Sequence, residues 1–205
     1  MALTRIDIID AALLRIGSEP IHDDGAAGGE ALLAIYQSVT GYCLSAYPWT
    51  WNRVVRRLVR LSDPPVAFYA HQFDEPDDML GAPRAAYASA GCHQPLSRWE
   101  RLGGKILADV PDLWIEMDKR SEPTAWPAYF AELVQVAIMA EFALSIREDR
   151  ALYDRLHAQV FGTPSEMRQG GMMGVAMNAD AQSKPSEALD MSRGSNPLLA
   201  ARSGG

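Results

Sequence analysis

The chain has 205 residues, of which 48% are hydrophobic, and its formal net charge is -7. This length and apolar content predict one folded domain with an appendage and exclude extensive disorder. Because proteins that hold nucleic acid by its phosphates are usually basic, the acidic balance argues against bulk DNA binding. The two cysteines are too few for a disulfide framework, so we expect free thiols in a reducing compartment.

Two amphipathic helices are predicted in the first fifty residues. The first begins at a capping box formed by Thr4 and Asp7, and its apolar residues recur at steps of three and four. The second covers about residues 30–46 by the same periodicity and stops before Pro48, which cannot continue a helix. Cys43 lies on the apolar stripe of this second helix, which indicates a structural thiol rather than a nucleophile.

Pro48, Trp49 and Trp51 follow the second helix directly. We interpret them as a structural hinge, in which the two indole rings lie on one side of the chain and close the end of a helical bundle. A platform on which nucleic-acid bases stack is the alternative interpretation.

A run of basic and apolar residues comes next. Its spacing predicts an amphipathic helix with a basic face. Such a face is commonly solvated or ion-paired, but it can also meet an acidic partner or line a channel through which DNA passes. The arginines of this run, which are candidate interface residues, are Arg53, Arg56, Arg57 and Arg60.

Short strands are predicted after this run. Pro64 and Pro65 break the chain, and residues 66–73 read as an aromatic strand followed by an acidic turn. Residues 105–109 and 113–117 read as two further strands, the second with alternating apolar and polar residues. We therefore predict that residues 51–120 form a small β-rich insert.

The chain returns to helix after residue 120. A central helix begins near Pro127 and is apolar almost all round, which is typical of a helix surrounded by protein. It contains Glu132 and Glu141, so we do not expect it to span a membrane. A shorter helix follows at residues 149–161. The predicted fold class is mainly α: an antiparallel helical bundle of residues 1–50 and 121–168, with the β-rich insert and an extended C-terminal tail.

Residues 169–205 are predicted to be a flexible tail, because glycine and small polar residues dominate. The tail also carries apolar residues that are unusual in a solvated segment. Two interpretations stay open: a dispensable disordered tail, or a segment that docks onto a partner. The candidate interface residues in it are Met172, Met173, Leu198 and Leu199.

No motif in the chain predicts catalysis, a metal or a cofactor. Cys92 and His93, with His71 near in sequence, lack a third ligand at a recognisable spacing. A hydrolase that uses Cys92 and His93 is therefore only a rival hypothesis, and the prediction is that the protein is not an enzyme.

Six segments occur in an order that matches a known family. They are residues 9–17 of the first helix, the element Tyr47-Pro48-Trp49, the basic run 56–61, the aromatic strand and turn 68–80, the hairpin 104–117 and the start of the central helix at 126–133. In this order they resemble the tail tubular protein A family, the head-to-tail adaptors of short-tailed phages. The likeness covers roughly residues 5–160, judged by these periodic patterns. Residues 81–101 and the C-terminal tail have no clear counterpart.

The resemblance implies a structural virion protein that forms a ring, typically of twelve copies in that family, between the portal and the tail. The implied partners are the portal protein, a downstream tail or nozzle protein and other copies of the chain. Passing DNA would be contacted without sequence specificity, and no contact with a membrane is expected. The implied location is the neck of the virion, and the host cytoplasm during assembly. The alternative function is a DNA-binding helical regulatory module that uses the tryptophans and arginines.

Overall fold

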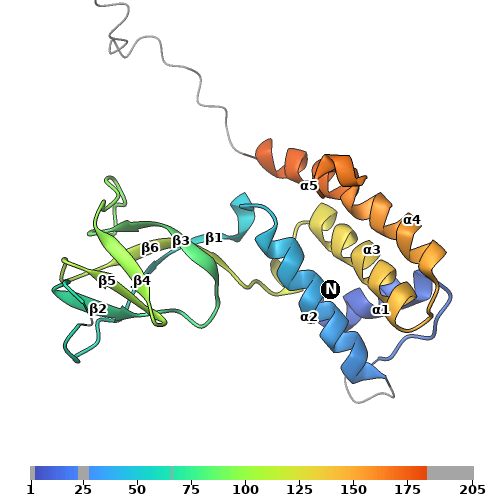
Figure 1. The fold of residues 1–205 in the computed structure, drawn as a ribbon, viewed down its shortest axis with the longest axis horizontal. Helices are drawn as coiled ribbons and strands as arrows, with labels where there is room; N and C mark the ends of the chain where they lie inside the picture. The colour runs from blue at the N-terminus through green and yellow to red at the C-terminus, as the bar shows by residue number, and fades with distance from the viewer. Residues whose placement is uncertain (1–2, 23–27, 66, 184–205) are drawn as a thin grey trace, which may run out of the picture.

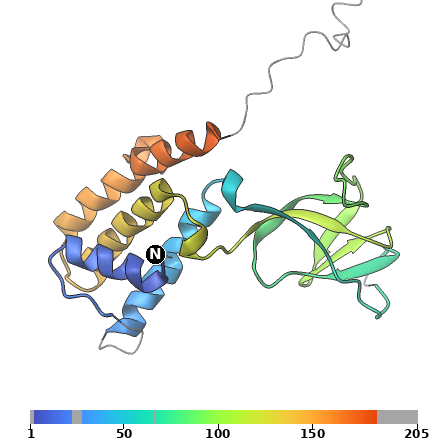
Figure 2. The same ribbon diagram turned by 180° about the vertical axis from the view of Figure 1, so that it is seen from behind.

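The computed structural model describes residues 3–22, 28–65 and 67–183, which form two modules joined side by side (Figure 1; Figure 2 gives the view from behind). The helical module contains α1 (Arg5–Arg15), α2 (Gly29–Ser45), α3 (Ala128–Ser145), α4 (Arg150–Phe161) and α5 (Gly171–Ala181). The β module contains β1 (Arg53–Arg57), β2 (His71–Asp74), β3 (Met79–Tyr87), β4 (Trp99–Leu102), β5 (Lys105–Ala108) and β6 (Trp114–Lys119).

The prediction of a mainly α fold is wrong. The protein is 45% helical and 19% strand, with two three-stranded antiparallel sheets, so its class is mixed. The helical periodicity was strong and long, whereas each strand is short and only partly alternating, so the sequence pattern understates the β content.

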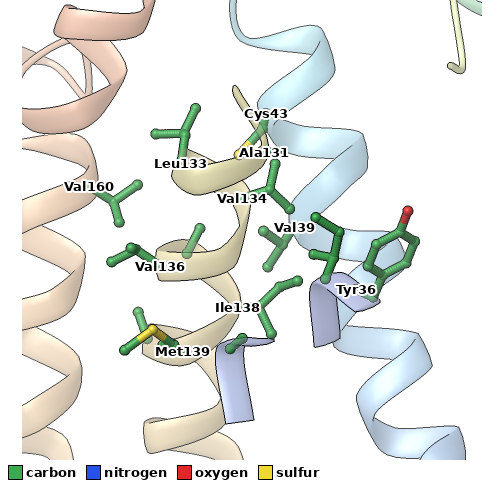
Figure 3. Packing of buried hydrophobic residues seen from close by; sticks show 14 of the residues in the cluster. Tyr36, Val39, Cys43, Ala131, Leu133, Val134, Val136, Ile138, Met139 and Val160 are labelled. Atoms are coloured by element: carbon green, nitrogen blue, oxygen red, sulfur yellow. The ribbon is translucent and has the colours of Figure 1, made fainter. Parts of the chain in front are cut away.

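Helix α3 is the centre of the helical module and contacts α1, α2, α4 and α5. Its side chains are buried on nearly every side, as the all-round apolar pattern predicts. Figure 3 shows Leu133 and Val136 facing Val160 of α4, while Val134 faces α2. Each fully buried aliphatic side chain of this kind stabilises the fold by about 1.5–3 kcal/mol.

The β module has its own core. One sheet has the strand order β1-β6-β3 and the other β2-β5-β4. Phe73, Ile106, Ile115 and Met117 are fully buried and bring both sheets into one apolar cluster, separate from that of the helices. The strands that enter and leave this module, β1 and β6, are paired neighbours, with Arg53 opposite Asp118.

The basic run forms strand β1 and not the predicted amphipathic helix. Arg53 to Arg57 pair residue by residue with β6, which supplies hydrogen-bond partners that no local pattern reveals. The β-branched Val54 and Val55 favour this extended conformation. The predicted strand at residues 66–73 is also shorter than expected and begins at His71.

The C-terminal tail also differs from the prediction, because residues 171–181 form helix α5 against α3 and α4. Met173 and Ala176 are buried there. Gly171 permits this close packing: it has a φ of +55°, and a Cβ at its position would lie 2.4 Å from the backbone oxygen of Gln159. Residues 184–205, with Leu198 and Leu199, lie outside the described residues.

The predicted capping box at α1 is confirmed. The Asp7 N–H donates to Thr4 Oγ1 at 3.2 Å, and the Thr4 N–H donates to Asp7 Oδ2 at 2.8 Å. The hydrogen bonds from Thr4 lower the pKa of the Asp7 carboxyl. This helix start, unlike β1, could be predicted because all of its partners lie within four residues.

Candidate interaction interface

Residues 48–52 connect α2 to β1, and the two tryptophans among them pack into or against the helical core. Trp49 is fully buried, and its Nε1–H donates to the carbonyl oxygen of Cys43 at 2.9 Å. Its ring lies 5.1 Å from that of Phe130, and the ring of Trp51 lies 4.9 Å from Phe130. Aromatic pairs at these distances stabilise the connection. Trp49 has no free face on which a base could stack, while Pro48 is exposed.

Asn52 ties together the two chain segments that cross between the modules. It is fully buried, and its Nδ2–H donates to the carbonyl oxygen of Lys119 at 2.7 Å. The incoming and outgoing segments are therefore fixed relative to each other at the base of the β module.

Three of the four candidate arginines are ion-paired within the β module. Arg53 lies 2.9 Å from Glu116 on β6. Arg56 makes two hydrogen bonds to the carboxylate of Asp78, at 2.6 and 2.8 Å, a bidentate geometry that is stronger than a single contact. These hydrogen bonds lower the pKa of the Asp78 carboxyl. The carboxylates neutralise most of the basic face that the sequence predicts.

Arg57 and Arg60 differ in their surroundings. Arg57 pairs with Asp112, and its guanidinium lies 5.5 Å from the ring centre of Trp114. Arg60 is exposed and bridges to Phe73 through its backbone, and within the described part of the chain its side chain has no ion pair. Arg60 is thus the member of the run that is available to a partner.

Asp180, near the end of α5, binds the connection between the modules. The carboxylate is fully buried and accepts hydrogen bonds from the Thr50 N–H at 2.9 Å and the Thr50 hydroxyl at 2.8 Å. The Tyr129 hydroxyl on α3 donates to it at 3.3 Å. Burial, together with this carboxylate, raises the pKa of Tyr129 to about 12. Helix α5 is therefore fastened both to α3 and to the connection that precedes β1.

The two methionines predicted as interface residues belong mainly to the fold. Met173 is fully buried in the helical core, and Met172 packs against that core while remaining partly exposed. Met172 also lines a groove of about 410 Å³ between α3, α4 and α5, which we call the α5 groove. Its lining residues are Tyr129, Glu132, Gln159, Gly171, Met172, Val175 and Ala176.

A second hollow, of about 210 Å³, lies between α2, α3 and α4. Arg168 lies over its aromatic walls, with the guanidinium 5.3 Å from the ring centre of Tyr42 and 5.8 Å from that of Phe161. Burial, assisted by Arg168, lowers the pKa of His157 in the same hollow. Arg168 already lies over the rings of Tyr42 and Phe161, so these two aromatic faces of the hollow are covered by a cation of the chain itself.

The two cysteines differ in their surroundings. Cys43 is fully buried, and burial raises the pKa of its thiol to about 12, which disfavours the thiolate that a nucleophile needs. The Cys92 thiol lies near backbone oxygens of Ser89 and Ala90. Among the described residues, no three His, Cys, Asp or Glu side chains are grouped closely enough to hold a metal ion.

Helix α3 is long and apolar enough to cross a membrane by length and composition, but 61% of this window is buried inside the protein. It is therefore the core helix of this fold.

No family model matches the chain, and no curated protein matches it either.

Sequence reasoning identified the arginines but missed their partners and missed Asp180. Arg56 and Asp78 are 22 residues apart, and Arg57 and Asp112 are 55 apart, so no local spacing signals these pairs. It also missed Phe68, which was read as part of a strand but lies in the loop after β1 with 94% of its surface exposed. An apolar residue between prolines and a turn is the one sequence signal that would have pointed to this loop.

Proposed function

We propose that this chain is a structural subunit of a phage neck, a head-to-tail adaptor that forms a ring under the portal and leaves a channel for DNA. The ordered segments that resemble the tail tubular protein A family are the reason for naming this class. The partners under this proposal are the portal protein, the next tail or nozzle protein and other copies of the chain.

The observation that supports the proposal best is the division into two modules with separate cores. A subunit of a ring needs two different faces, because each copy contacts its two neighbours through unlike surfaces. Two independently packed modules joined through residues 48–52 and 119–127 supply such faces on one chain.

A DNA-binding regulatory module is supported less well. Trp49 is buried, and Arg53, Arg56 and Arg57 are paired with carboxylates, so the predicted stacking and basic surface is largely occupied. Such a module requires affinity for duplex DNA that falls steeply with salt. We expect weak binding of free duplex at low salt and little residual binding at physiological salt.

The decisive experiment is size exclusion with light scattering, on the full-length protein alone and mixed with the portal protein of the same genome. We expect a large complex of fixed stoichiometry in the mixture. A well-folded protein that forms no such complex at any salt concentration would show that the portal-adaptor proposal is wrong.

Truncations locate the portal-binding part of the C-terminal region. A chain ending at Ser183 keeps α5 and the Asp180 contacts, so it should remain as stable as the full-length protein. If residues 184–205 carry portal affinity, this chain binds portal more weakly. A chain ending at Gln169 is a poor substitute, because it also removes Met173 from the helical core.

A further inference from the structure

Helix α5 is a peripheral helix of the helical module and depends on the surface on which it docks. It contacts α3, α4 and the short 3₁₀ helix Thr50–Asn52 beside the connection between the modules, and it lies at the edge of the helical module (Figure 1). Gly170, at its N-cap position, has no side chain to cap it, and Gly171 and Gly174 weaken it further. A helix of this length and composition is unstable alone in water, so α5 needs a partner surface.

The turn that leads from α4 into α5 is exposed and strained. Residues 163–169 are all exposed, so the turn can change its conformation without uncovering the core. Met167 and Arg168 have φ of +50° and +62°, a left-handed conformation that is unfavourable for residues with a Cβ. Arg168 stacks on the ring of Tyr42, whereas the side chain of Met167 is 80% exposed. A short turn under strain favours opening into a longer connection.

The surface that α5 covers fits the α5 of a second copy equally well. Met173 is buried in the helical core, and Asp180 accepts hydrogen bonds from the N–H and the hydroxyl of Thr50. These contacts stay the same when α5 belongs to another chain. Residues 163–170, when fully extended, span up to roughly 28 Å, and a helix with its side chains is about 10–12 Å wide. The opened turn is therefore long enough to carry α5 to a neighbouring copy.

We propose that α5 is exchanged between copies of this chain. The α5 of one copy docks on α3, α4 and Thr50 of the next, and residues 163–170 form the extended connection between them. When each copy gives its α5 to one neighbour and receives that of the other, the contact is head-to-tail and closes into a ring or extends into a filament. The inference rests on the proposed ring only in preferring this arrangement to a reciprocal pair.

A disulfide between positions 50 and 183 shows on which copy α5 docks. The hydroxyl oxygens of Thr50 and Ser183 lie 2.8 Å apart, which is close enough for two cysteines to be bridged. The full-length chain with Thr50→Cys and Ser183→Cys is oxidised over a concentration series and run on a non-reducing gel. Cys92→Ser is included because this native thiol is partly exposed. We expect covalent multimers that increase with concentration, and a disulfide within single chains at every concentration would overturn the exchange.

A mixture of the two single variants makes the test specific. Neither Thr50→Cys nor Ser183→Cys alone can form this disulfide within one chain. In an equimolar mixture, an exchanged α5 links one chain of each kind into a covalent heterodimer. Each variant oxidised alone is the control for accidental crosslinks, and a mixture that yields no more covalent dimer than these controls would refute the exchange. Circular dichroism and melting temperature check that each variant is folded.

Substitution of Met167 tests whether strain in the turn drives the exchange. Met167→Gly removes the strain of the closed turn, so the dissociation constant for self-association should rise about fivefold or more. Met167→Val tolerates the left-handed conformation less than methionine, so the constant should fall by a similar factor. Sedimentation velocity measures both changes. Leu14→Ala, which shortens an exposed residue on α1, is the control and should associate as the wild type does.

The two directions of change separate strain from a surface contact. If the Met167 side chain itself contacted a neighbour, the shorter valine would not strengthen the association. Changes of the same sign in both variants would therefore contradict the role of strain.

The outcomes also separate this inference from the proposed function. A chain that binds portal but forms the disulfide only within single chains would refute the exchange and leave the adaptor proposal in place. Exchange of α5 without portal binding would do the reverse.

Discussion

The helical and β modules are held together by different means. The helical module packs aromatic and aliphatic side chains around α3, with Phe130 between the rings of Trp49, Trp51 and Trp126. The β module has a smaller core and carries ion pairs across its strands and turns, including Arg56 with Asp78 and Arg84 with Asp118. Apolar burial supplies most folding free energy, whereas half-exposed ion pairs mainly fix geometry. We therefore expect the helical module to supply most of the folding free energy of the chain. The ion pairs of the β module should mainly fix the arrangement of charges on its surface.

The largest expected effect is the loss of the aromatic centre of the helical module. Phe130→Ala removes a fully buried ring and leaves a cavity, which should lower the free energy of unfolding by about 3–5 kcal/mol. Urea unfolding followed by circular dichroism measures this change. Phe68→Ala removes the same side chain from an exposed site and should change stability by less than about 0.5 kcal/mol. Equal losses in both variants would contradict the contrast.

Alkali should act on the helical module first. Burial raises the pKa of Tyr36 and of Cys43 to about 12 each, above their ordinary values of 10.0 and 9.0. A raised pKa means that the folded state favours the neutral form of the group. The contribution of each group to the free energy of unfolding is therefore complete below its ordinary pKa and is lost as pH rises toward 12. Each pKa unit corresponds to about 1.4 kcal/mol. Urea unfolding between pH 8 and 11, values chosen to bracket these ordinary pKa values, should show falling stability.

Tyr36→Phe removes one of these titrating groups and should flatten that decline. If the decline is as steep in this variant as in the wild type, the buried phenol does not contribute to it.

A smaller effect is expected where α5 meets the connection between the modules. Asp180→Ala leaves the Thr50 N–H and hydroxyl without their acceptor, which should cost about 1–3 kcal/mol. Hydrogen exchange should show that amides of α5 lose protection while those of β5 do not. The control is Asp154→Ala, which removes an exposed ion pair with Arg150 on α4. It should leave the α5 amides protected from exchange.

The smallest effect belongs to the ion pairs of the β module. Hydrogen bonds from Arg56 lower the pKa of Asp78 below its ordinary value of 3.8, so the pair stabilises the fold above that value and is lost as pH falls below it. Because both side chains are about 40% exposed, Arg56→Gln should cost less than about 1 kcal/mol at neutral pH. Unfolding curves at pH 7 and near pH 3, on either side of the ordinary value, should show a smaller difference from wild type at the lower pH.

The same contrast explains which elements could be predicted from the sequence. Helices α1 to α4 follow from local periodicity and caps, since their hydrogen bonds join residues four apart. Strand β1 could not be predicted as a strand, because its partner β6 is some sixty residues away and the arginine spacing imitates a helix. Helix α5 was missed because Gly170, Gly171 and Gly174 argue against a helix locally, while the close approach of Gly171 to the backbone of α4 requires a residue without a Cβ.

The candidate interface could be predicted only in part, because the sequence shows the residue types but not their partners. The residue type of Arg53, Arg56 and Arg57 signals charge, but whether that charge is free depends on carboxylates from distant turns and strands. Exposure of Phe68 depends on how Arg98 and Asp109 hold the loop, which no spacing records.

The pairing of β1 with β6 has a consequence for how this chain can be rebuilt. Arg53 and Asp118 stand opposite each other in an antiparallel pair, so the two ends of the β module lie only about 4.5–5.5 Å apart. A short turn could join Asn52 to Lys119 and leave the helices in place, because closely spaced ends let a domain be inserted or removed without straining its host. The β module is therefore replaceable: a different domain, inserted between the same two residues, would give the same helical module a new surface.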